Sequence, residues 1–217
     1  MLDTVHLIAE LIGIVAFAVS GAMLAAEKNL DIFGIIVLGV VTAFGGGVIR
    51  DLLLGITPPA MFNSQPEFWA AVLSSVLVFL VYRYADKLNT EGTANYRAAV
   101  NFFDAVGLGV FSITGVQAAI NCGNAGNPLF AISLGVITGI GGGMLRDILN
   151  GDIPSVLRKN IYALAAILGA ASYYMMIISG YPEIPAVILS FCLTFGIRMA
   201  ATCLGWHLPH PRRRKKQ

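Results

Sequence analysis

Charged residues are scarce in this sequence, and their scarcity excludes an ordinary soluble domain. Lysine, arginine, aspartate and glutamate make up 12% of the 217 residues, whereas a soluble domain carries about 25%. Apolar residue types account for 57%, and the mean hydropathy is +0.77. A chain of this composition is expected to be an integral membrane protein.

Residue types that carry enzyme or metal chemistry are also few. The chain has three cysteines and three histidines, and none stands at metal-ligand spacing. Cys192 and Cys203 lie about three helical turns apart in one apolar segment, so they cannot pair with each other. No serine–histidine–aspartate set, nucleophile elbow or phosphate loop occurs. We therefore expect no enzyme, no metal site and no resident cofactor.

The basic residues that exist gather at the C-terminal end. Five of the 14 lysines and arginines lie at 212–216. Such a tail fixes the membrane topology and attracts anionic lipid headgroups. Nucleic-acid binding is less expected, because no folded basic domain accompanies the tail. The apolar N-terminal segment has no basic region and no clear cleavage site before or after it, so we expect a membrane helix and not a signal peptide.

Long apolar segments dominate the chain. Each is long enough to cross about 30 Å of hydrocarbon as a helix. The seven predicted spans are 6–26, 31–54, 67–84, 97–120, 128–150, 160–179 and 184–204. The sequence therefore predicts an all-α membrane protein with a single transmembrane domain over 1–204 and a basic tail over 205–217.

Basic residues outside the spans, or at their edges, follow only the first, third, fifth and seventh spans. The N-terminal segment and the other three connections contain none. Because cytoplasmic loops carry the excess of lysine and arginine, we expect the N-terminus outside and the C-terminus in the cytoplasm.

The first half of the chain recurs in the second half. A shift of 94 positions takes Glu10 to Asp104, and a shift of 96 takes Thr42 to Thr138. Because a unit of three spans reverses the direction of the chain, the second copy should be inverted, related to the first by a pseudo-twofold axis in the bilayer plane. The two repeats and the additional seventh helix cover about 6–84, 97–179 and 184–204.

The residues that are energetically least favourable in a membrane helix, glycines and charged side chains, form a motif that occurs twice. Three glycines precede an Arg-Asp pair in the second and the fifth span. Glycine costs roughly 1 kcal/mol of helix stability relative to alanine, and a central charge costs at least about 2.5 kcal/mol. We predict that helices 2 and 5 are broken or kinked there and that the breaks face protein or a water-filled cavity. The two copies consist of Gly45, Gly46, Gly47, Arg50 and Asp51, and of Gly141, Gly142, Gly143, Arg146 and Asp147.

The repeated acids suggest charge pairs. Glu10 with Arg50, and Asp104 with Arg146, are predicted to be symmetry-related pairs at the two ends of one polar path. The alternative is that the arginines only anchor the helices at the headgroups, and that small residues at every fourth place let helices pack closely. The sequence favours the path and leaves the alternative open.

Three further polar side chains have two possible roles each. Thr42 and Thr138 precede the glycines by about one turn, where their hydroxyls could meet a passing ion or bond their own backbone. Arg198 lies about two turns from the cytoplasmic end of the seventh span and is expected to reach the headgroups, and a functional role is the alternative. Aromatic side chains near span ends, Tyr162 and Trp206 among them, fit interfacial belts.

This arrangement resembles the prokaryotic branch of the trimeric intracellular cation (TRIC) channel family. The resemblance rests on the doubled Gly-Gly-Gly-x-x-Arg-Asp motif and the two inverted three-span repeats plus one, and it covers nearly the whole chain. It implies a homotrimer in the inner membrane of a prokaryote, with a pore in each protomer that passes monovalent cations, chiefly potassium but also sodium. It also implies hinge and pore roles for the two motif copies, and lipid bound near the trimer centre. The Lys-Glu-Val type motif of animal members is absent.

Three functions therefore compete. A passive cation channel is favoured, although a fixed arginine raises a barrier to cations unless Asp51 and Asp147 neutralise it. A moving Arg-Asp pair would then act as a gate. A secondary transporter of a small amino acid such as glycine is the alternative. The sequence also resembles a domain that is labelled a glycine transporter, and broken-helix ends are how such transporters hold an amino acid. A structural or lipid-handling membrane protein is the third.

Overall fold

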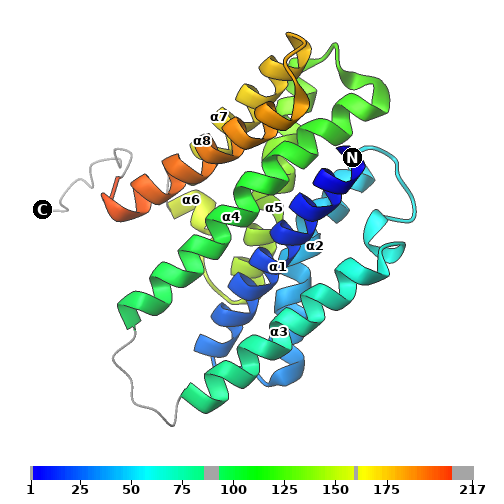
Figure 1. Cartoon of the computed structure of the whole chain (residues 1–217). Coiled ribbons are helices and arrows are strands. Elements are labelled where there is room, and N and C mark those ends of the chain that lie inside the picture. Colours follow the sequence, from blue (N-terminus) through cyan, green and yellow to red (C-terminus); the bar gives the residue numbers. More distant parts are fainter. Residues whose placement is uncertain (1, 86–92, 159–160, 207–217) are drawn as a thin grey trace, which may run out of the picture.

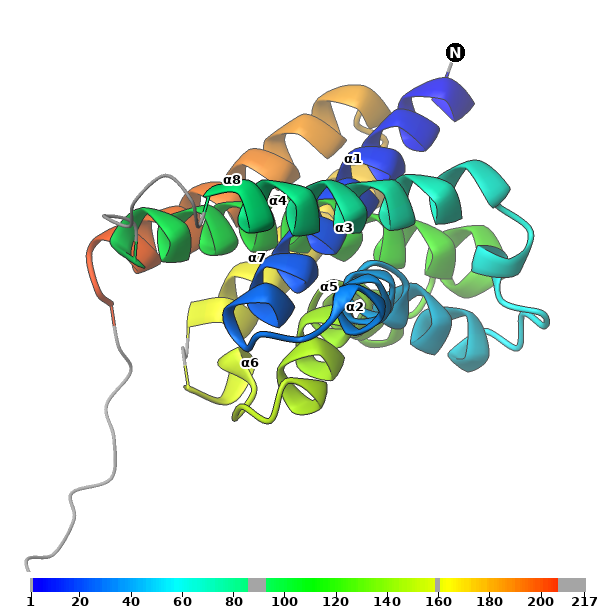
Figure 2. The ribbon, with the colours of Figure 1, turned by 90° about the horizontal axis from the view of Figure 1, so that it is seen from below.

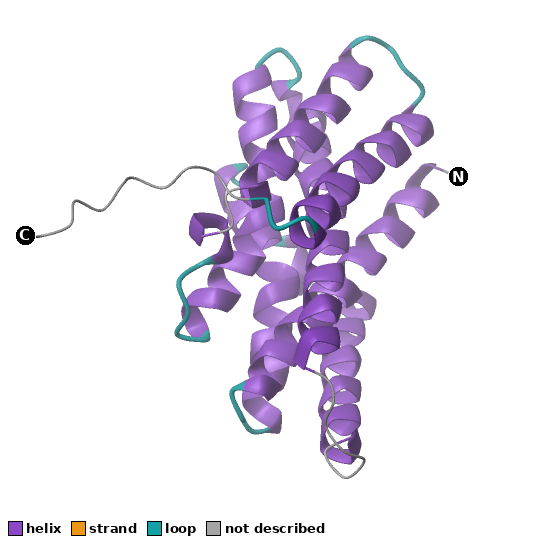
Figure 3. Ribbon diagram, turned by 90° about the vertical axis from the view of Figure 1, so that its left-hand side faces the viewer, coloured by secondary structure: helices purple, strands orange, loops and turns teal. Residues whose placement is uncertain are grey.

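The computed structural model describes residues 2–85, 93–158 and 161–206, and these form helices joined by short loops without strands (Figure 3). Seven helices of this part are long and apolar enough to span a membrane, as predicted. They are α1 (Leu2–Glu27), α2 (Ile32–Leu53), α3 (Gln65–Ala85), α4 (Thr93–Ala119), α5 (Pro128–Leu149), α7 (Ile161–Ile178) and α8 (Glu183–Cys203). Shorter pieces are the 3₁₀ turn η1 (Ala60–Phe62), the π-helical η2 (Ile120–Asn124) and α6 (Ser155–Arg158). Several basic residues behind the predicted orientation, at 87, 159 and 212–216, lie outside the described residues.

The helices pack as two equivalent groups. In each, the first helix packs on the second and third: α1 on α2 and α3, and α4 on α5 and α7. Across the groups, α1 packs on α4 and α2 on α5, and the members of both pairs run in opposite directions (Figure 1). Figure 2 shows α2 and α5 side by side. The additional helix α8 lies outside this symmetric core, and its close contacts are with α4 and α7.

The helices α2 and α5 are continuous through their glycines, so the predicted break is wrong, whereas the alternative of a kink stays a prediction. The glycines instead let the two helices touch. A Cβ atom on Gly46 would lie 2.0 Å from the carbonyl oxygen of Thr138, and one on Gly142 would lie 2.1 Å from that of Thr42. No real Cβ fits at such a distance. The close packing of the helices therefore offsets the low helix propensity of glycine.

The third glycine of each triplet has a different environment. Around Gly47, only Arg50 Nη2 lies near an added Cβ, at 3.9 Å. A Cβ on Gly143 would lie 2.9 Å from the Tyr162 hydroxyl and 3.8 Å from Arg146 Nη2. The first two glycines thus serve the crossing of α2 and α5, whereas the third leaves space beside the arginine.

Both triplet helices end in the same way. Gly55 and Gly151 follow them with φ of 72° and 75°. Each glycine N–H donates to the carbonyl three residues earlier, and the next N–H donates to the carbonyl five residues earlier, which is a Schellman motif. Arg50 and Arg146 consequently lie in the last turn, where the helix dipole favours a cation.

Candidate functional site

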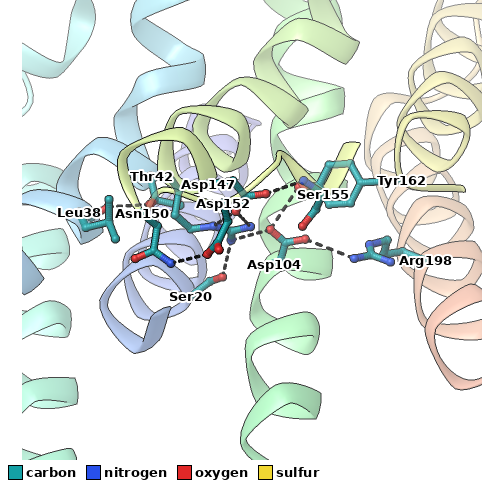
Figure 4. A network of polar contacts seen from close by, with 11 residues as sticks. Ser20, Leu38, Thr42, Asp104, Asp147, Asn150, Asp152, Ser155, Tyr162 and Arg198 are labelled. Carbon is teal, nitrogen blue, oxygen red and sulfur yellow. Dashed lines mark hydrogen bonds and ion pairs between the residues drawn. The ribbon is translucent and has the colours of Figure 1, made fainter. Parts of the chain in front are cut away.

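Arg146 is the centre of a buried polar cluster that joins α1, α4 and α5. Its Nη1 donates to Asp104 Oδ1 at 2.8 Å and to Ser20 Oγ at 2.7 Å, and its Nε donates to Asp147 Oδ1 at 2.9 Å (Figure 4). The predicted pair of Asp104 and Arg146 is therefore present. Ser20 was not predicted, because a serine in an apolar helix carries no signal of such a role.

Both carboxylates of this cluster bind more than the arginine. Asp147 Oδ2 accepts from the backbone N–H of Ser155 at 2.6 Å, where α6 begins. Asp104 Oδ1 accepts from the Tyr162 hydroxyl at 3.1 Å. Because a buried charge is costly without partners, these additional donors help to stabilise two carboxylates inside the helix bundle.

A second arginine, from the unrepeated helix α8, completes the cluster. Arg198 Nη2 lies 3.8 Å from Asp104 Oδ2, and the guanidinium carbon lies 4.7 Å from the centre of the Tyr162 ring. Both predictions for these residues are wrong. Tyr162 is 2% exposed and does not lie in an interfacial belt, and Arg198 is 3% exposed and points inward instead of reaching the headgroups.

A cavity of about 560 Å³, here called the vestibule, opens beside the Arg146 cluster. This volume is large enough for several water molecules at about 30 Å³ each. Lys28, in the turn after α1, forms an ion pair with Asp152 at 3.1 Å, and both line the vestibule. Its charged lining residues balance: Glu27, Asp104, Asp147 and Asp152 against Lys28, Arg97, Arg146 and Arg198.

The corresponding cluster at Arg50 is looser and has less space. Arg50 Nε donates to Asp51 Oδ1 at 2.8 Å, and its Nη1 lies 3.9 Å from Glu10 Oε1, so the second predicted pair is present as well. Asp51 Oδ2 accepts from the N–H of Ala60 at 2.8 Å, at the start of η1, as Asp147 does at α6. The cavity here measures only about 20 Å³.

The two clusters lie at opposite ends of the helix crossing. On α1, Glu10 faces Arg50 and Ser20 faces Arg146, and ten residues of helix span about 15 Å. Between them lie the glycine crossing and a stacked aromatic pair, Phe17 and Phe111, with ring centres 5.2 Å apart. Apolar and glycine surfaces therefore separate the vestibule from the small cavity at Arg50.

The two threonines belong to this barrier. Thr42 and Thr138 are fully buried, and each hydroxyl donates at 2.6 Å to the carbonyl four residues earlier, Leu38 or Leu134. Neither lines the vestibule or the cavity at Arg50. Their observed contacts match the self-bonding role, and their part in ion passage stays a prediction.

The sequence is similar to those of known membrane proteins. A family model described as glycine transporter matches residues 7–83 and 101–177, two segments that lie 94 positions apart, as Glu10 and Asp104 do. The UPF0126 inner membrane protein YadS of Escherichia coli K12 is 39% identical over 206 residues, which cover 93% of each chain.

Solved structures extend this likeness to three dimensions. The trimeric intracellular cation channel orthologue from Rhodobacter sphaeroides superposes with a TM-score of 0.84 at 36% identity, over 94% of this chain and 100% of that one. A prokaryotic TRIC channel crystallised in 0.5 M KCl gives a TM-score of 0.86 at 34% identity, over 95% and 100% of the two chains.

Fold and cluster together define a multi-pass membrane protein of the cation-channel class, and its structural neighbours are ion channels, not enzymes. The chain belongs to the prokaryotic TRIC channel family, the family that the glycine-transporter model describes.

Proposed function

We propose that this protein is a potassium-permeable monovalent cation channel, a homotrimer with one pore in each protomer between the two repeats. The N-terminus lies outside, and the vestibule opens to the cytoplasm. The single observation that carries the proposal is the vestibule of about 560 Å³, which ends at the Arg146 cluster and whose counterpart in the other repeat, at Arg50, is a closed cavity of about 20 Å³.

The geometry supports a closed channel with one open mouth. A cation that enters the vestibule meets carboxylates already neutralised by Arg146 and Arg198, and a fixed positive charge raises its barrier further. Displacement of the Arg146–Asp147 pair would expose these carboxylates. We propose that conduction also requires α2 and α5 to shift at the glycine crossing, so the two triplets retain their predicted hinge and pore roles.

Transport of glycine is the second candidate, because the matching family model is described by that activity. A zwitterionic substrate needs an arginine with donors available for its carboxylate. Arg146 already donates to Asp104, Asp147 and Ser20. At Arg146, the occupied donors thus support a transporter less than a channel.

Reconstitution into planar bilayers separates the two candidates. We expect unitary potassium currents, with a reversal potential that follows the potassium gradient. Saturable uptake of labelled glycine into vesicles without resolvable current would refute the channel. For the assembly, native mass spectrometry should give the mass of three chains with bound lipid, and a crosslinking ladder that stops at two chains would contradict the trimer.

A further inference from the structure

A second cavity lies next to the vestibule, at the end of α8. This side pocket has a volume of about 240 Å³ and lies among α4, α7 and α8. Asn101 and Arg198 line both the side pocket and the vestibule, so they form part of the wall between the two. The vestibule lining balances positive with negative charges, whereas Arg198 is the one charged side chain among the described residues that line the side pocket.

Arg198 has fewer hydrogen-bond acceptors than its burial requires. Arg146 donates to two carboxylates and a serine, whereas the Arg198 side chain donates to Thr202 Oγ1, at 3.0 Å. Asp104 is 3.8 Å away, beyond hydrogen-bond distance, and Arg198 Nε has no acceptor in the described part of the chain. A buried guanidinium with unmet donors indicates that another acceptor completes its surroundings.

The position and shape of the side pocket indicate what this acceptor is. A guanidinium presents a planar fork of N–H donors that fits phosphate oxygens. Trp206, 49% exposed, also lines the pocket just after α8 ends, and tryptophan is enriched at headgroup level. We propose that the side pocket binds a phosphate group through Arg198, supplied by an anionic lipid headgroup or by free phosphate.

Binding there would act on the vestibule through the same side chain. Phosphate oxygens compete with Asp104 for Arg198, and withdrawal of Arg198 leaves four acids against three bases in the vestibule lining. The vestibule becomes net negative, which favours cation entry. This regulatory step rests on the proposed channel function, whereas the binding step does not.

The chain offers a built-in reporter for binding. It contains two tryptophans, so Trp69→Phe leaves Trp206 as the single one, at the pocket itself. In purified full-length protein, dioctanoyl phosphatidylglycerol should change Trp206 emission saturably, and dioctanoylglycerol, which lacks the phosphate, should not. Arg198→Gln should weaken the affinity at least tenfold. Arg83→Gln, which removes an exposed arginine from the last turn of α3, should leave it unchanged.

Each outcome bears on the proposal. If Arg198→Gln does not fold, Arg198→Lys keeps the charge without the fork and should weaken binding several-fold. Saturation by inorganic phosphate at the same affinity identifies free phosphate as the occupant, and saturation by the lipid alone identifies the headgroup. Wild-type affinity in Arg198→Gln, or no saturable change with either ligand, overturns the site. Currents that ignore phosphatidylglycerol in a protein that binds it overturn the regulatory step alone, and absence of any current counts against the channel without touching the fluorescence result.

Discussion

The two ends of the crossing between α2 and α5 carry the same charged motif but enclose different amounts of space. At both, an aspartate holds its neighbouring arginine and the backbone of the next segment. At one, Asp104 is 3% exposed and 2.8 Å from Arg146, and at the other, Glu10 is 32% exposed and 3.9 Å from Arg50. The larger cavity nevertheless adjoins the tighter cluster. The repeat therefore positions the charges, and the residues that differ between the copies decide which end is open.

Removal of each arginine in turn should give the largest difference in stability between the two ends. Arg146→Gln leaves the buried carboxylates of Asp104 and Asp147 without their main partner, and we expect a loss of about 3–5 kcal/mol in the free energy of unfolding. Arg50→Gln, the matched control, should lose about 1–2 kcal/mol, because its second acid is distant and partly exposed. Unfolding in mixed micelles measures both. Unchanged stability and unchanged currents in Arg146→Gln would remove this cluster from the mechanism.

The glycine crossing gives the next largest effect. Gly46→Ala would place a Cβ 2.0 Å from a backbone oxygen that cannot move independently, so α2 and α5 must separate, at an expected loss of about 3 kcal/mol. Gly142→Ala should behave alike, with its Cβ 2.1 Å from the symmetric oxygen.

Gly47→Ala is the neighbouring control for the crossing. Its Cβ meets only Arg50 Nη2 at 3.9 Å, and alanine should add up to about 1 kcal/mol of helix stability. Thermal unfolding in detergent compares the two variants. Equal loss at Gly46 and Gly47 would show that the crossing is not the cause.

The third glycine of each triplet should also respond differently to substitution at the two ends. Gly143→Ala places a Cβ 2.9 Å from the Tyr162 hydroxyl, which must move and weaken its bond to Asp104. We expect Gly143→Ala to lower the free energy of unfolding by about 1 kcal/mol, whereas Gly47→Ala should not lower it. Tyr162→Phe combined with Gly143→Ala is the check, because removal of the hydroxyl should abolish most of the clash; a full loss in the double variant would contradict this explanation.

The smallest effect is expected at the mouth of the vestibule. Lys28→Gln removes an ion pair to Asp152 whose side chains are both about half exposed, so we expect a loss of only about 0.2–1 kcal/mol, and less in high salt. Its effect on current should be easier to detect, because one positive charge disappears from the vestibule lining. Single-channel potassium conductance at low and high salt measures this. An unchanged conductance at low salt would place Lys28 outside the ion path.

The residues that follow the repeat could be predicted from the sequence. The pairs of Glu10 with Arg50 and Asp104 with Arg146 required only the shift between the halves and the alternation of spans. Arg198 could not be found this way, because α8 has no counterpart in the repeat. Tyr162 lies two residues after the start of a span, and its position alone suggested an interface, whereas its contact with Asp104 depends on how α7 packs on α4 and α5.

The glycine triplets show a different limit of sequence reasoning. Helix propensity is a local quantity, and by that measure three successive glycines predict a break. The gain at Gly46 and Gly142 comes from the carbonyls of Thr138 and Thr42 on the other helix, more than 90 positions away in the chain. Such a tertiary contribution is visible only when both helices are placed.

The reciprocal contacts at the crossing have the form of an isologous dimer interface, in which each partner offers the same patch to the other: Gly46 meets Thr138, and Gly142 meets Thr42. In a dimer of identical chains, every mutation would alter both copies of that patch at once. Here the copies belong to one polypeptide and can diverge independently. The molecule can therefore retain a symmetric joint while one side of it acquires the tyrosine and the additional arginine that the other side lacks.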